Sequence, residues 1–174
     1  MAFQLGYYDS PLGRVTLAAD DAALVGLWLP GQQQLSSGPW MGAANVARAA
    51  EPAVQQIFAA TSNWLDSYFA GGALPELPPI KLLGTAFRQE VWRLLLAIPY
   101  GATCTYGELA AQLAQRRGLA RMSAQAVGGA VGHNPISVIV PCHRVVGANG
   151  KLTGYNGGIA LKQWLLAHEQ QLVR

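Results

Sequence analysis

Several residue types are scarce in this sequence. Of the 174 residues only two are cysteine and three are histidine, which excludes a disulfide scaffold and a cysteine-rich zinc site. Charged residues make up 12% of the chain and hydrophobic residues 51%, so disorder of the whole chain is excluded. No apolar run approaches the ~20 residues that span a bilayer, and no secretory signal is recognisable. We therefore expect a soluble cytoplasmic protein with no membrane partner.

Basic residues are scarce in the first half of the chain. Residues 1–80 carry two basic and six acidic side chains, whereas residues 81–174 carry ten basic and three acidic ones. A basic segment following an acidic one suggests that the C-terminal half meets an anionic partner. An accident of small numbers explains the imbalance equally well, so the motifs must decide.

The first part of the chain predicts a small β-sheet and one helix. Short apolar or alternating runs over 3–8, 14–19 and 24–29 are bounded by turn residues, which is typical of strands. A helix is expected over 51–69. Residues 30–44 are expected to form a loop, and the proline-rich stretch 71–84 a linker.

The second part predicts mostly helix. Apolar residues fall on one face of a helix over 85–98, and Thr105 with Glu108 forms a capping box that opens a short helix to about residue 113. Further helices are expected over 123–134 and 159–168, and the β-branched run 136–140 predicts a strand. The fold class is therefore α/β (α+β): a small N-terminal β-sheet plus helix domain, residues 1–80, and a mostly helical C-terminal domain, residues 81–174. Its two short helices resemble a helix-turn-helix.

Residues 124–132, Ala-Gln-Ala-Val-Gly-Gly-Ala-Val-Gly, are nearly all small. Each glycine inside a helix costs about 1 kcal/mol relative to alanine, so three need a reason. One reason is close packing on a neighbouring helix. The other is a smooth surface that enters the minor groove of DNA, which is only ~6 Å wide. The sequence leaves both open.

The string Pro141-Cys142-His143-Arg144 is the sharpest chemical signal. A thiol attacks only as its thiolate, which an adjacent imidazole and the charge of Arg144 would favour. In an extended chain Cys142 and His143 point to opposite faces, so the imidazole must act through a turn or a bridging water. A buried, inert cysteine is the alternative, and we accept it for Cys104.

An imidazole base also needs an orienting carboxylate, and the basic half offers Glu90, Glu108 and Glu169. Glu108 is committed to its cap. Glu169 ends the closing helix, where the helix dipole disfavours an acid. It is either functional or part of an exposed helix end.

At Pro141-Cys142-His143-Arg144-Val145 the sequence resembles the O6-alkylguanine-DNA alkyltransferases, also called methylated-DNA–protein-cysteine methyltransferases. The resemblance extends over about residues 85–169. It includes Ile98-Pro99-Tyr100-Gly101, Thr105-Tyr106, Ala126-Val127-Gly128-Gly129-Ala130, Asn134-Pro135-Ile136, Gly154-Tyr155 and Lys162-Gln163-Trp164-Leu165-Leu166. The first 80 residues resemble the family's variable N-terminal domain only in pattern.

The resemblance implies DNA repair by a single-turnover methyltransferase. An alkyl group passes irreversibly from O6-alkylguanine in double-stranded DNA to Cys142. The sequence leaves open whether O4-alkylthymine is also a substrate. The protein is consumed. Helix-turn-helix binding in the minor groove flips the damaged base. No cofactor or metal is implied, and the protein is expected to be a monomer.

Family motifs also imply the roles of single residues. The residues implied in the transfer are Cys142, His143, Glu169 and Tyr106. Cys142 would accept the alkyl group, His143 would deprotonate it through a water, and Glu169 would hold the imidazole. Tyr106 would contact guanine N3 and the phosphate of the flipped nucleotide.

Other matching positions are implied to bind the base and the duplex. Those for the base are Asn134, Val145, Tyr155, Asn156 and Gly157. Asn134 would brace the cysteine turn, the Val145 backbone would read guanine, and the last three would form the pocket wall. Those for DNA are Tyr106, Ser123, Ala124, Gln125, Ala126, Gly128 and Gly129.

One position departs from the family, because Gln125 stands where relatives usually carry an arginine that fills the gap in the base stack. This puts the wedge in doubt and leaves the chemistry intact. Two other functions stay open. One is a lesion binder of the same fold, a kind of protein that lacks the cysteine. The other is a cysteine–histidine hydrolase or redox enzyme, although the sequence offers no motif for an oxyanion site.

Overall fold

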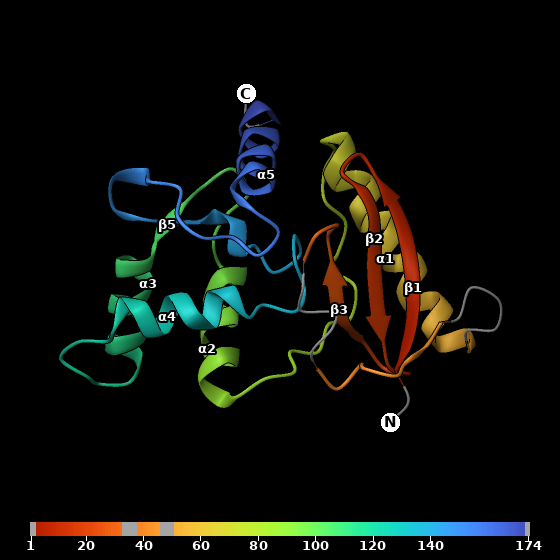
Figure 1. The fold of residues 1–174 in the computed structure, drawn as a ribbon, viewed down its shortest axis with the longest axis horizontal. Coiled ribbons are helices and arrows are strands. Elements are labelled where there is room, and N and C mark those ends of the chain that lie inside the picture. The colour runs from red at the N-terminus through yellow and green to blue at the C-terminus, as the bar shows by residue number, and fades with distance from the viewer. Residues whose placement is uncertain (1–2, 33–37, 46–50, 173–174) are drawn as a thin grey trace. The chain divides into compact units, whose positions relative to one another are not determined.

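The computed structural model describes residues 3–32, 38–45 and 51–172. The chain forms two compact units (Figure 1). The first comprises Met1–Leu83 with Pro135–Ser137, and the second Gly84–Asn134 with Val138–Arg174. Three residues from the later part of the chain therefore belong to the first unit. Within the described ranges, no helix combines the length and the hydropathy needed to cross a membrane.

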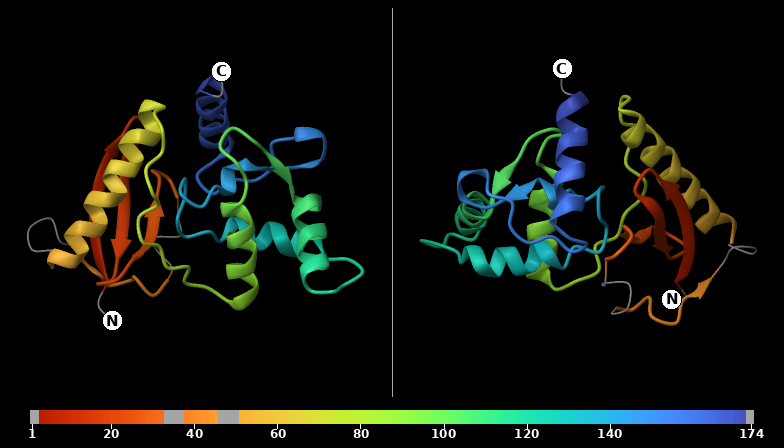
Figure 2. Two further views of the ribbon diagram at one scale, coloured as in Figure 1. Left: turned by 180° about the vertical axis from the view of Figure 1, so that it is seen from behind. Right: turned by 45° about the horizontal axis from the view of Figure 1, so that its top comes forward.

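The first unit is a four-stranded sheet covered by one helix, as Figure 2 shows. Strands β1 (Gln4–Ser10), β2 (Gly13–Ala19) and β3 (Leu24–Trp28) pair antiparallel, and the short β4 (Ala44–Asn45) pairs parallel with β1. Helix α1 (Pro52–Ala70) starts with a proline in its first turn and ends at Gly71, whose φ of 74° is left-handed. Its buried residues recur every three or four positions, so one face packs on the sheet.

Aromatic packing fixes one side of this unit. The rings of Trp28 and Trp40 lie 4.8 Å apart, in a cluster with Ala18 and Val25. Gly26 is required there, because a Cβ atom at this position would lie 1.9 Å from the Trp28 ring. At the edge strand β3, Leu27 donates its backbone N–H to Pro135 and accepts one from Ser137. Backbone groups of an otherwise open edge are thereby paired.

The second unit carries four α-helices in the part of the chain that the structure describes. They are α2 (Ala86–Leu96), α3 (Tyr106–Arg116), α4 (Ala124–Gly132) and α5 (Ile159–Leu172). Strands β5 (Cys104–Thr105) and β6 (Val145–Val146) form a two-residue parallel pair. Short 3-10 turns η2 (Cys142–Arg144) and η3 (Ala148–Gly150) lie on either side of β6. Figure 1 shows α3 and α4 joined by a loop, and the Trp92 indole of α2 donates a hydrogen bond to the Ala130 carbonyl of α4 at 2.8 Å.

The predicted fold class is confirmed, and the caps at Thr85, Thr105 and Ser123 begin helices where the sequence indicates. The predicted strand over 136–140 is wrong. Only Ile136 makes an isolated bridge, and Val138 adopts a left-handed φ of 68° that breaks any extended run. The closing helix runs four residues beyond the predicted end at 168, to Leu172. Of the predicted loop 30–44, residues 33–37 lie outside the described residues, and Ala44 begins β4.

Candidate active site

Cys142 lies at the start of a tight turn. Pro141 precedes η2, the Cys142 N–H donates to the Val140 carbonyl at 2.8 Å, and only 6% of the residue is exposed. Asn134, which follows α4, donates through Nδ2 to the same carbonyl at 2.8 Å and also hydrogen-bonds with the cysteine side chain. The Asn134 amide therefore ties the end of α4 to the turn, which explains why residues 136–140 bend instead of forming a strand.

The next two residues of the turn, His143 and Arg144, form a buried cluster of ionisable side chains with Glu169. His143 Nε2 lies 2.6 Å from Glu169 Oε1. Arg144 binds both oxygens of the same carboxylate, at 2.8 Å and 3.0 Å, and donates to the Ile98 carbonyl at 2.7 Å. The Gly101 N–H adds a fourth contact to Glu169 at 3.2 Å. The carboxylate near the end of α5 is therefore fully engaged and is not an exposed helix end.

The charges in this cluster set the protonation state of the imidazole. Burial opposes ionisation of Glu169, but the hydrogen bonds from His143 and Arg144 prevail and lower its pKa to about 2. Burial lowers the pKa of His143 despite the carboxylate. A neutral imidazole beside an ionised carboxylate carries its proton on Nε2. Nδ1 is then the basic nitrogen, and it is buried with no hydrogen-bond partner in the described part of the chain.

The thiol of Cys142 is protonated in this resting arrangement. Burial raises its pKa, against the opposing effects of hydrogen bonds with Asn134 and Tyr155 and of the charge of Lys162. The expectation that Arg144 supplies this charge is wrong, because its guanidinium is bound by Glu169 and Ile98. The nearby cation is a lysine twenty residues further along the chain, which adjacency in sequence could not indicate.

Tyr106 lies where α3, α4 and α5 approach one another. It is the first residue of α3, immediately after the Thr105 cap. A Cβ atom at Gly128 of α4 would lie 3.6 Å from its ring, and Lys162 Nζ of α5 lies 5.8 Å from the ring centroid. Its side chain also interacts with that of Thr153 and with Cys142. The phenol is therefore part of the same cluster as the thiol.

Helix α4 presents small residues to solvent. Ser123 caps it by accepting the Ala126 N–H at 3.2 Å, and Val127, Ala130 and Val131 form its buried face. Gly129 and Gly132 have open space where a Cβ atom would point, and the neighbour of Gly128 is at ordinary contact distance. Close packing therefore does not explain the glycines. Ala124, Gln125 and Ala126 lie on the exposed side of the helix.

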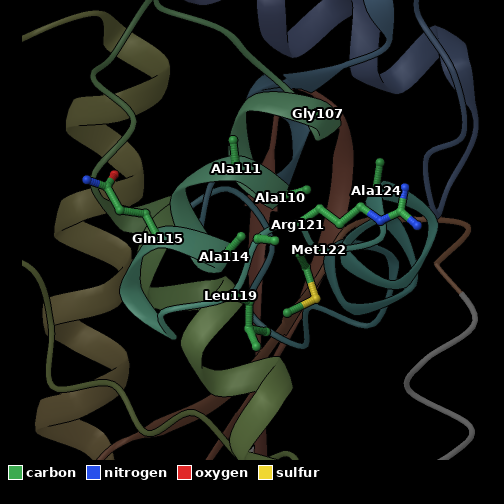
Figure 3. A pocket seen from close by; sticks show the side chains of 10 residues that line it. Gly107, Ala110, Ala111, Ala114, Gln115, Leu119, Arg121, Met122 and Ala124 are labelled. Atoms are coloured by element: carbon green, nitrogen blue, oxygen red, sulfur yellow. The ribbon is translucent and has the colours of Figure 1, made fainter.

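A cavity of about 500 Å³ lies beside α3, and Figure 3 shows the side chains around it. Small residues of α3 form one side, and Leu119, Arg121 and Met122 of the loop before α4 form the other. Cys142 does not line it. The cavity therefore belongs to the helix pair and not to the thiol.

The remaining predicted base-binding residues come from the loops around η2 and α5. Val145 is buried in β6, opposite Cys104. Tyr155, Asn156 and Gly157 lie in the loop before α5, where Gly157 and Gly158 both have positive φ. No cluster of three or more metal-binding side chains occurs within the described ranges.

Sequence reasoning missed Lys162. The buried residues of α5 are Lys162, Leu165 and Glu169, so its inward face carries two charged side chains. The signal available in the sequence was a lysine two helical turns before the suspected glutamate, on the same face of the helix.

Comparison with protein families defines the class. The model for the 6-O-methylguanine DNA methyltransferase ribonuclease-like domain matches residues 4–76, and that for the DNA-binding domain of the same methyltransferases matches residues 86–171. The chain is thus a two-domain methyltransferase of the kind that repairs DNA by alkyl transfer.

Individual relatives of the chain point to the same class of methyltransferase. A methylated-DNA–protein-cysteine methyltransferase of Mycolicibacterium paratuberculosis is 45% identical over 94% of this chain and 90% of its own length. One from Salmonella typhimurium is 53% identical over 64% of this chain and 63% of its own length. The crystal structure of Mycobacterium tuberculosis OGT in complex with DNA has a TM-score of 0.76 at 40% identity, covering 99% of this chain and 94% of that one. The chain belongs to the methylated-DNA–protein-cysteine methyltransferase family.

Proposed function

We propose that this protein removes the alkyl group from O6-alkylguanine in double-stranded DNA by transferring it to Cys142, once per protein molecule. The observation that carries the proposal is the buried series of Cys142, neutral His143 and ionised Glu169, which provides a nucleophile, a base and an orienting group. The family supplies the substrate class.

The base is His143 acting through Nδ1. Glu169 accepts a hydrogen bond from Nε2–H at 2.6 Å and thereby fixes the tautomer. The thiol proton passes through one water to Nδ1, and the imidazolium that forms is stabilised by the carboxylate. Nδ1 makes no hydrogen bond to the thiol or to any other group within the described residues, so we infer that a relay is required.

The transfer is a single displacement at the alkyl carbon. The Cys142 sulfur forms an S–C bond as the C–O6 bond breaks, and that bonding pair stays on the guanine oxygen. Tyr106 donates a hydrogen bond to purine N3 and disperses the charge that the leaving base acquires. Guanine gains one proton at N1 and the thiol has lost one, so the net proton change is zero. The thioether has no good leaving group, and the protein is therefore consumed.

The duplex is bound through α4 and the residues at its start. An exposed face of small side chains fits a minor groove ~6 Å wide, and the Tyr106 ring adjoins Gly128 on that helix. The target base leaves the stack and enters the pocket walled by Tyr155, Asn156 and Gly157, at a cost of a few kcal/mol. Backbone groups of Cys142 and Val145 read its edge.

The same chemistry extends to O4-alkylthymine, whose alkyl carbon is also bonded to an exocyclic oxygen. We propose it as the slower substrate, because a pyrimidine is smaller than a purine and presents O2 in place of N3 to Tyr106. Competition between duplexes carrying each lesion tests this order, and equal rates would contradict it. We also propose that the protein acts as a monomer in the cytoplasm, which size-exclusion chromatography with and without duplex and localisation of a tagged chain would examine.

Intact-protein mass spectrometry tests the central proposal. Incubation with an O6-methylguanine duplex should add the mass of one CH2 group, saturating at one equivalent. Cys142→Ser should bind the duplex and gain nothing, whereas the matched variant Cys104→Ser should react like the wild type. Methyl transfer to Cys142→Ser would overturn the assignment.

The alternatives give different results in the same assay. A lesion binder would hold the duplex tightly without any change in protein mass. A hydrolase would release free methanol over many turnovers and keep its own mass.

A further inference from the structure

Lys162 is a buried cation with no carboxylate partner among the residues that the structure describes. It is fully buried on the inward face of α5. Its Nζ donates to the carbonyls of Thr153 and Gly154, at 3.2 Å and 3.5 Å, and no ion pair involves it within residues 3–32, 38–45 and 51–172. An ammonium taken out of water is costly unless an opposite charge compensates it. The ionisable group that acts on it electrostatically is Cys142, whose thiolate form favours the charged ammonium.

The loop that Lys162 holds carries contacts to both reactive groups. The Thr153 side chain interacts with Tyr106, and the Tyr155 side chain interacts with Cys142. The two carbonyls bound by Nζ belong to Thr153 and Gly154, between these side chains. Lys162 Nζ itself lies 5.8 Å from the centroid of the Tyr106 ring. The Lys162 ammonium is thus hydrogen-bonded to the loop backbone and lies beside the phenol ring of Tyr106.

We propose that Lys162 is a positioning residue for the alkyl transfer: its ammonium holds residues 153–155 against Tyr106 and Cys142 and is the counter-ion of the attacking thiolate. The proposal rests on the proposed function. Arg144 cannot take this part, because Glu169 and the Ile98 carbonyl occupy its guanidinium.

The ionisable groups around the thiol come from several elements. They are Tyr106 of α3, His143 and Arg144 of η2, Tyr155 of the loop after η3, and Lys162 and Glu169 of α5. Arg144 and Glu169 neutralise each other, and the phenols are uncharged at neutral pH. Removal of Lys162 therefore removes the cation that acts directly on the sulfur.

The first test measures the Cys142 thiol with iodoacetamide as a function of pH, without DNA, and locates the adduct by peptide mass. Lys162→Met should raise the pKa of the thiol and slow its alkylation at neutral pH about tenfold, the effect of one pKa unit. Lys162→Arg should restore most of the rate. Lys151→Met removes the same charge from an exposed site and should match the wild type. An unchanged titration in Lys162→Met would overturn the proposal.

A second measurement covers the case in which Lys162→Met fails to fold. Coupling between two sites is reciprocal. The pKa of the Lys162 ammonium, followed by NMR at Cε, should therefore be lower in Cys142→Ser than in the wild type. An unchanged value would overturn the proposal. Both readouts are independent of DNA, so a wild-type protein that accepts no methyl group would refute the proposed function while the thiol titration still reports on Lys162.

Discussion

His143 and Glu169 meet across the second unit, with Nε2 of the imidazole 2.6 Å from Oε1 of the carboxylate and both side chains fully buried. The carboxylate is ionised and the imidazole neutral, so the proton lies on Nε2 and the lone pair on Nδ1. The tautomer, and with it the direction in which His143 accepts a proton, is set by Glu169.

Glu169→Gln should slow methyl transfer by about 10²–10⁴-fold per folded molecule, because the amide can donate to Nε2 and favour the tautomer with a proton on Nδ1. Single-turnover assays with an O6-methylguanine duplex in excess measure the rate. Circular dichroism corrects for unfolded protein, since breaking a buried charge pair also destabilises the fold. A variant that folds and reacts at the wild-type rate would show that Glu169 does not control the base.

Acid should destabilise the protein in two steps. The pKa of His143 is lower in the folded protein, so the unfolded chain binds its proton first and stability falls as the pH drops below its ordinary value of 6.5. Glu169 has a folded pKa of about 2 against an ordinary 4.5, so its contribution is present above 4.5 and is lost as the pH falls towards 2. The second step is on the order of 3 kcal/mol.

Urea unfolding at a series of pH values measures both steps. In His143→Asn the decrease just below the ordinary histidine pKa should disappear while the lower step remains. If wild-type stability is constant from neutral to mildly acidic pH, the burial of a neutral histidine is contradicted.

Gly129→Ala should stabilise the protein by about 0.5–1 kcal/mol, because a Cβ atom there meets open space and helical glycine is unfavourable. The urea midpoint measures the gain. Gly26→Ala is the contrasting control and should destabilise the first unit, since its Cβ would overlap the Trp28 ring.

Gly129→Leu is expected to fold as well as Gly129→Ala and to bind an undamaged duplex more weakly, because a large side chain would hold α4 out of the groove. Fluorescence anisotropy at fixed salt compares the two variants. Equal affinities would mean that this face of α4 does not enter the groove.

Gln125→Arg should strengthen duplex binding and make it more dependent on salt, by roughly one unit in the slope of log K against log salt concentration. Gln125 is exposed on α4, so the new charge can reach the phosphates or the gap in the stack. Gln56→Arg adds the same charge on α1 of the first unit and should change binding less. Unchanged or weaker binding of Gln125→Arg would refute the idea that this position contacts DNA.

The parts of the fold that could be predicted from the sequence are those that depend on residues close together in the chain. The Thr105–Glu108 capping box forms with both of its hydrogen bonds, and β1, β2 and β3 lie within two residues of their predicted ends, whereas β4 was not predicted. These features depend on neighbours in the chain, which a single sequence displays.

The parts that could not be predicted depend on tertiary partners. The run 136–140 is rich in β-branched residues, which predicts a strand. In the structure the Asn134 amide donates a hydrogen bond to the Val140 carbonyl, and the segment bends at Val138. Lys162 was read only as part of a family motif, because a buried lysine is rare and nothing local predicts the carbonyls that receive it. Arg144 is two residues from Cys142 in the sequence, which suggested that its charge stabilises the thiolate. In the structure its guanidinium is instead paired with the Glu169 carboxylate.

The tripeptide Pro135–Ser137 separates Asn134 from Val138 in the chain and pairs with Leu27 of the first unit. A chimaera that exchanged only residues 1–83 with a relative would therefore join a foreign edge strand to a native tripeptide. Recombination between such proteins therefore has to keep β3 and the tripeptide compatible. The side chain at position 136 has to vary together with the sheet of the first unit, although more than fifty residues of the second unit separate the two in the sequence.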